Sequence, residues 1–155
     1  KEPVYILGMG AASAPMNVTG RSTFSGLDCA KLAGQEAYEM AGVGPQDIDV
    51  AEVHDCFTIA EMMAYEALGF AEPGKGPELI RNRETYKEGK IPVNVDGGLL
   101  SKGHPIGATG GSQVRTIVLQ LRDKAGAIQV PGAEIGLVHN IGGVGIYGNV
   151  IIFGR

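Results

Sequence analysis

Three short polar segments carry the side chains of this sequence that could do acid–base or nucleophilic chemistry. They are His54-Asp55-Cys56-Phe57, Gly103-His104-Pro105 and His139-Asn140-Ile141-Gly142-Gly143, and each adjoins an apolar run or a predicted helix. Polar loops at strand ends are where α/β sheets build active sites. Imidazole, thiol and exposed backbone N–H groups together suit acyl chemistry in which an oxyanion must be stabilised.

Cys56 is the thiol that the sequence places best for reactivity. It lies close to His54 and directly before a predicted helix that begins near Thr58. A helix N-terminus and a nearby imidazole both favour thiolate, so we expect a lowered pKa for Cys56. The alternative is a buried cysteine that only packs, which is our interpretation of Cys29, inside a predicted helix.

The same side chains could bind zinc instead of doing acyl chemistry. The candidate ligands would be His54, Cys56, His104 and His139. No pair of them has the i, i+4 or Cys-x-x-Cys spacing that zinc sites favour. We therefore predict no metal site.

Two glycine-rich segments invite a nucleotide-binding interpretation. Residues 8–13 lack the third glycine and the following helix of a dinucleotide site, so we interpret them as a turn that ends a strand. Residues 107–112 open a helix and could cradle an anion, but they lack the lysine of a P-loop. Close packing at a helix start is the alternative for this second segment.

Hydrophobic periodicity predicts the order β-α-β-α-loop-α-β-β. The last predicted strand is apolar on both faces, which indicates a sheet covered on both sides and hence a layered α/β domain. The expected strands cover 4–7, 48–53, 134–139 and 145–153, and the expected helices cover 27–41, 58–68, a short stretch near 77–82, and a segment that follows Gly107 and stops near Gly126.

Length and composition bound the classes of function. The chain has 155 residues, a net charge of −4 and no Lys/Arg block, so nucleic acid and anionic membranes are poor candidate partners. No apolar run approaches the length of a membrane span. Two cysteines form no disulfide framework, which favours a reducing, cytoplasmic location. The chain opens on Lys1-Glu2-Pro3 and runs straight into an apolar segment, so we expect it to belong to a longer protein.

Taken together, these segments resemble the C-terminal half of the thiolase family along the whole chain. The resemblance is strongest at His54-Asp55-Cys56-Phe57, at residues 97–110 and at Asn140-Ile141-Gly142-Gly143. The His-Asp-Cys-Phe form is similar to sterol-carrier-protein-type thiolases and archaeal acetoacetyl-CoA thiolases, whereas degradative and biosynthetic thiolases carry Asn-Glu-Ala-Phe there. The resemblance implies that residues 1–155 form one thiolase C-terminal domain, a βαβαβαββ half with helices on both faces of a mixed sheet. Two such halves stack into a five-layered αβαβα body.

The resemblance also implies an activity. Thiolases transfer acyl groups between a reactive cysteine and coenzyme A, joining or cleaving a carbon–carbon bond beside a thioester. The nucleophile and most coenzyme A contacts lie in the N-terminal half, so we expect this chain alone to be inactive. Coenzyme A and acyl-CoA are then substrates, and no cofactor is bound permanently. The implied partners are the N-terminal half, further copies in a homodimer or tetramer, and a small zinc-ribbon/OB-fold accessory protein.

Four residues receive roles through the resemblance. His104 would activate the nucleophile and donate to a thioester oxygen, and His54 would help to form that oxyanion hole. The backbone N–H of Gly142 would belong to a second hole that faces the acyl-enzyme. Asn140 stands where many thiolases place an acid/base cysteine in a Cys-x-Gly motif, so Cys56 would supply that thiol.

Two other functions stay open at this point. One is an aldolase of the same superfamily that cleaves sterol side-chain acyl-CoA compounds without a thiol nucleophile. The other is a lipid- or acyl-CoA-binding module with no enzymatic activity, which needs a closed apolar pocket within this half alone. A cysteine in the nucleophile motif of the preceding half would favour thiolase over aldolase.

Overall fold

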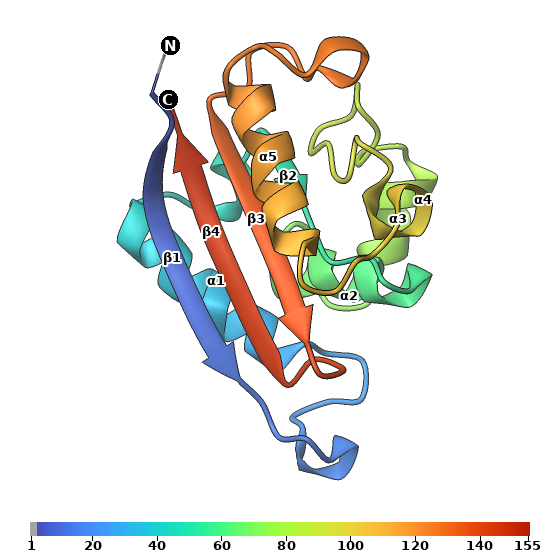
Figure 1. The fold of residues 1–155 in the computed structure, drawn as a ribbon. Coiled ribbons are helices and arrows are strands. Elements are labelled where there is room, and N and C mark those ends of the chain that lie inside the picture. Colours follow the sequence, from blue (N-terminus) through green and yellow to red (C-terminus); the bar gives the residue numbers. More distant parts are fainter. Residues whose placement is uncertain (1–2) are drawn as a thin grey trace.

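The computed structural model describes residues 3–155, and its centre is a four-stranded mixed sheet (Figure 1). The strand order is β1-β4-β3-β2. β1 pairs antiparallel with β4, β4 antiparallel with β3, and β3 parallel with β2. The strands are β1 (Tyr5–Ser13), β2 (Val50–Glu52), β3 (Ile135–Gly142) and β4 (Tyr147–Gly154).

Helices cover both faces of this sheet, as the apolar last strand predicts. α1 (Asp28–Ala41) packs on β1 and β4 from one side, and α5 (Thr109–Leu121) packs on β2 and β3 from the other (Figure 1). The other α-helices lie between β2 and α5 in the chain. They are α2 (Thr58–Ala67), α3 (Gly76–Arg81) and α4 (Gly98–Lys102), with 3₁₀ turns at Val18–Gly20, Pro45–Asp47 and Gly126–Ile128.

Two apolar clusters form, one on each side of the sheet. On the α1 side, Leu137 and Ile152 pack with the alanines of α1. On the α5 side, Val138 and Phe153 pack with Ile117. Successive residues of β3 and β4 thus enter opposite clusters, because side chains alternate across a strand. The α/β fold class with helices on both faces is confirmed.

The interpretation of residues 8–13 as a strand-ending turn is wrong, because β1 runs through them. The glycines serve close packing instead. A Cβ at Gly10 would lie 2.0 Å from the carbonyl oxygen of Ala33, and one at Gly8 would lie 2.2 Å from that of Ala37. The small residues of α1 therefore bring its backbone against β1, and only glycine leaves room for it.

Other boundaries shift by a few residues. β2 is shorter than the predicted strand 48–53, and β3 extends to Gly142. α5 ends at Leu121 rather than near Gly126, and Asp123 adopts a positive φ of 52° just after it. The additional strand of a βαβαβαββ half is reduced to a bridge between Ala51 and Val93.

Lys1 and Glu2, named in the expectation about the chain start, lie outside the described residues. Within residues 3–155, no helix combines the length and the apolar character that crossing a membrane requires.

Candidate active site

The segment 54–57 connects β2 to α2 at the carboxyl end of the parallel pair β2 and β3 (Figure 1). His54 and Asp55 are buried, Cys56 is half-buried, and Phe57 is exposed. The chain thus turns its two polar side chains inward and an aromatic ring outward. The polar loops at the strand ends predict an active site at this edge of the sheet.

His104 reaches the same place from the loop between α4 and α5. Its Nδ1 lies 2.7 Å from the hydroxyl oxygen of Thr109, and that hydroxyl lies 3.2 Å from the carbonyl oxygen of Pro105, to which it donates. A hydroxyl has one proton, so when Pro105 receives it the oxygen accepts from Nδ1–H. Nε2 then keeps its lone pair and can accept a proton. Sequence reasoning missed Thr109, although its place at a helix start beside a histidine is a signal for such a bond.

The structure brings the His54 and His104 rings into contact. Their centroids are 4.9 Å apart and their planes meet at 88°, an edge-to-face pair. Burial lowers the pKa of His54, and the charge of His104 lowers it further. The Nδ1 atom of His54 is buried without a hydrogen-bond partner. His54 is therefore held neutral, and it can offer an N–H to a substrate oxygen.

The expected lowering of the Cys56 pKa is wrong in direction. Burial raises the pKa of this thiol, and the negative charge of Asp55 adds to the rise. The backbone N–H groups of Phe57 and Cys56 act in the opposite direction but are outweighed. Loss of water favours the uncharged form of a thiol, and at this position it exceeds the effect of the helix end. Cys56 is thus a protonated thiol at neutral pH.

Gly142 ends β3 opposite Tyr147 and leads into a tight turn. A Cβ at Gly142 would lie 3.9 Å from the Tyr147 side chain, so packing does not demand glycine here. Within residues 3–155, no hydrogen bond or ring contact joins Cys56 or Gly142 directly to the imidazole pair.

Asn140 is committed to the sheet. Its side-chain amide donates to Gln113 of α5 over 2.9 Å, and Gln113 in turn donates to the backbone carbonyl of His139 over 3.1 Å. His139 is fully buried, and neither of its ring nitrogens has a partner. Burial, with a smaller effect of His54, lowers the pKa of His139 to about 3. His139 is therefore a neutral core residue.

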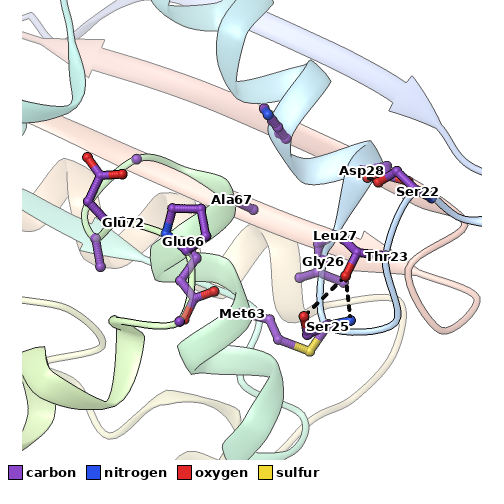
Figure 2. Close-up of a pocket in the computed structure, with 15 residues that line it drawn as sticks. Ser22, Thr23, Ser25, Gly26, Leu27, Asp28, Met63, Glu66, Ala67 and Glu72 are labelled. Carbon is purple, nitrogen blue, oxygen red and sulfur yellow. Dashed lines mark hydrogen bonds between the residues drawn. The ribbon is translucent and has the colours of Figure 1, made fainter.

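A separate cavity of about 650 Å³ lies between residues 22–31 and the end of α2 with the turn that follows it. Figure 2 shows the hydroxyl of Thr23 bonded to both the backbone N–H and the hydroxyl of Ser25, two residues that line this cavity. Met63 points toward the same segment (Figure 2). None of the four predicted site residues lines this cavity.

As to metal, residues 3–155 hold no group of three His, Cys, Asp or Glu side chains arranged to bind an ion.

The sheet order, the two covering helices and the strand-end imidazoles define a thiolase-like half domain. Residues 10–155 match the family described as Thiolase C-terminal domain-like, and the chain belongs to this family.

Curated relatives carry related names. The chain is 46% identical over 153 residues to an acetyl-CoA acetyltransferase of Methanothermobacter thermautotrophicus, covering 99% of this chain and 40% of that protein. It is 48% identical over 117 residues to sterol carrier protein 2 of Homo sapiens, covering 76% of this chain and 21% of that protein. It is 37% identical over 144 residues to benzoylsuccinyl-CoA thiolase subunit BbsB of Thauera aromatica, covering 92% and 37%.

A solved structure has the same fold. The Ltp2-ChsH2(DUF35) aldolase superposes with a TM-score of 0.85 at 27% identity, over 99% of this chain and 40% of that chain. The chain thus spans two fifths or less of the proteins that it matches here.

Proposed function

We propose that this chain is the C-terminal catalytic half of a thiolase of the acetyl-CoA C-acyltransferase type. It would act in the thiolytic cleavage or the Claisen condensation of acyl-CoA thioesters. The observation that carries the proposal is the edge-to-face pair of His54 and His104, with ring centroids 4.9 Å apart. Two imidazoles at one point can donate two N–H groups to one thioester oxygen once Nε2 of His104 has taken a proton, as an oxyanion hole requires.

His104 has the geometry of a base that becomes a donor. With Nδ1–H on Thr109, its Nε2 keeps a lone pair that can take the proton of a cysteine thiol in the N-terminal half. The resulting Nε2–H then points at the place where the thioester oxygen gathers negative charge. His54 adds the second donor, and its lowered pKa keeps the ring neutral.

Cys56 is proposed as the acid/base of the carbon–carbon step. Its raised pKa leaves the proton in place near neutral pH, so the thiol is ready to protonate the leaving carbanion during thiolysis. In condensation the same sulfur must first lose its proton and then remove one from the α-carbon of the acyl group. Asn140 cannot replace it, because its amide is held by Gln113 and does not titrate usefully.

Gly142 is proposed to donate its backbone N–H to the second oxyanion, on the side of the acyl-enzyme. The N-terminal half would supply the nucleophile and most contacts to coenzyme A, which is a substrate and not a resident cofactor. We further propose a cytoplasmic location, a homodimer or tetramer of the whole protein, and a small accessory protein of the zinc-ribbon/OB-fold kind as a further partner.

The test is complementation of one half by the other. This chain, joined to the N-terminal thiolase half that precedes it, should cleave acetoacetyl-CoA with coenzyme A, and the 155-residue chain alone should not. A matched pair with His104→Ala, which loses the base, and His104→Gln, which keeps one N–H donor, separates the two roles of this residue. Thiolysis by the chain alone, or no thiolysis by the joined protein, would contradict the proposal.

An aldolase is the second candidate, because the solved structure with a TM-score of 0.85 is named as one. Retro-aldol cleavage needs no cysteine nucleophile, so this activity should persist when that cysteine is replaced, whereas thiolysis should stop.

A lipid-binding module is less well supported. The cavity beside α2 has the charged side chains of Asp28, Lys31, Glu66 and Glu72 in its lining, which do not suit an acyl chain or sterol.

A further inference from the structure

The carboxylate of Asp55 is bonded to the N-terminus of α4. Its Oδ1 accepts the backbone N–H of Leu99 over 2.7 Å, and its Oδ2 accepts that of Leu100 over 3.4 Å. Asp55 is 3% exposed, so water does not compete for these bonds. The residue next to His54 in the chain is thus tied to the short helix that leads into the His104 loop.

Gly98 makes room for this carboxylate. A Cβ at Gly98 would lie 2.1 Å from Asp55 Oδ2, closer than any side chain could tolerate. Gly97 and Gly98 have φ values of +100° and +62°, a left-handed conformation that favours glycine. Gly98 therefore leaves the space that the Asp55 carboxylate occupies, a role that the sequence pattern alone does not predict.

The C-terminal end of α4 is tied to the last residue of β2. Lys102 forms an ion pair with Asp96 and lies 3.4 Å from Oε2 of Glu52, which is fully buried. Burial, together with the nearby charge of Asp96, raises the pKa of Glu52 to about 9. Asp96 also accepts the hydroxyl of Thr116 on α5 over 2.6 Å. Both ends of α4 are therefore held by side chains of residues 52–55 or by their direct partners.

We propose that Asp55 is a positioning residue that fixes His104 against His54 through α4, with Lys102 and Glu52 as the second tie. The connections are short: His54 is the neighbour of Asp55, and only Gly103 separates α4 from His104. α4 has five residues, and an isolated helix of that length is unstable in water. Without Asp55 the backbone N–H groups of Leu99 and Leu100 lose their side-chain acceptor, and only that of Gly98, bonded to Asp96, keeps one. The position of the following His104 loop is then less firmly fixed. The role in catalysis rests on the proposed function; the positioning of the rings does not.

The ring pair can be observed directly in the 155-residue chain. NMR cross-peaks between the ring protons of His54 and His104 report their contact without any turnover. We expect these cross-peaks in the wild type, their loss in Asp55→Ala, and weakened cross-peaks in Asp55→Asn, which keeps the size and one acceptor oxygen. If Asp55→Ala does not fold, Asp55→Asn carries the test.

Asp49 provides a matched control. Its Oδ2 accepts two backbone N–H groups, of Glu134 and Ile135, each over 2.8 Å, at the opposite end of β2. Asp49→Ala removes the same kind of bond and should lower stability, yet it should leave the ring cross-peaks unchanged. A merely structural Asp55 would behave like Asp49.

The joined two-half protein supplies a second readout. Asp55 is buried and holds α4, so Asp55→Ala should displace the His104 ring. A misplacement of about 1 Å can cost about 100-fold in rate, so kcat should fall by about that factor with little change in KM. Asp49→Ala should keep kcat. Unchanged ring cross-peaks in both Asp55 variants overturn the positioning role, whatever the activity. If the Asp55 variants lose the cross-peaks but the joined wild-type protein has no thiolase activity, the positioning role is upheld. That result counts against the proposed function alone.

Discussion

His139 offers a test of the structure that needs no activity. The ring is fully buried on β3, where strand alternation puts it on the same side as Leu137 and Ile141, and both of its nitrogens lack partners. Replacing it by leucine keeps an apolar volume in that place and breaks no side-chain hydrogen bond. An unsatisfied buried polar group costs about 1–3 kcal/mol, so His139→Leu should be at least as stable as the wild type near neutral pH.

The pKa of His139 sets how much unfolding free energy the protein loses as the pH falls. The folded-state pKa of His139 is about 3, below the value of about 6.5 for histidine in an unfolded chain. Between these values the unfolded state binds more protons than the folded state, so the folded state loses stability as the pH falls below about 6.5. At about pH 5 the gap is about 1.5 pH units, which corresponds to about 2 kcal/mol of lost unfolding free energy.

Urea unfolding followed by circular dichroism measures this difference. The wild type should lose about 2 kcal/mol more unfolding free energy than His139→Leu when the pH falls from about 7 to about 5. His54 and the carboxylates titrate in both proteins, so the comparison isolates His139. Parallel pH profiles for the two proteins would refute the reasoning, because they would mean that the folded ring accepts a proton as easily as an unfolded one.

Three further predictions concern the site and the surface. In the joined two-half protein, His104→Ala should slow acylation of the nucleophile by at least about 10²-fold, because it removes a base and an oxyanion donor together; near-normal acylation in stopped flow would contradict this. Thr109→Val should slow the same step less, since it removes only the hydroxyl on Nδ1 of His104; an effect larger than that of His104→Ala would argue against this order. The chain alone should self-associate, because the edge strand β1 exposes Tyr5, Ile6 and Met9; a strict monomer in light scattering would count against it.

The sequence carries much of the fold, and it places two of the candidate site residues at one edge of the sheet. Periodicity predicts four strands and the main helices, because both faces of β4 and one face of α5 are apolar over several residues. The strand-end rule brings segments 54–57 and 104 to one edge, where the rings of His54 and His104 do meet.

The errors arise where contacts between distant segments decide the outcome. Gly8 and Gly10 look like a turn from their neighbours, but their use depends on the backbone of α1, about 25 residues further on. The pKa of Cys56 depends on how much water the fold removes, which a helix-end argument does not include. The bonds from Asp55 to α4 also depend on tertiary contact, and only the unusual Gly97-Gly98 pair hints at them.

Exchange of the α-protons of acetyl-CoA into deuterated water tests the central claim, that this chain provides the acid/base chemistry of a thiolase. The joined two-half protein would be compared with its Cys56→Ser and Asn140→Ala variants, with acyl-enzyme formation followed by mass spectrometry in all three. We predict that Cys56→Ser still forms the acyl-enzyme but exchanges no α-proton above background, while Asn140→Ala exchanges close to the parent rate. Exchange at the parent rate in Cys56→Ser would contradict the account.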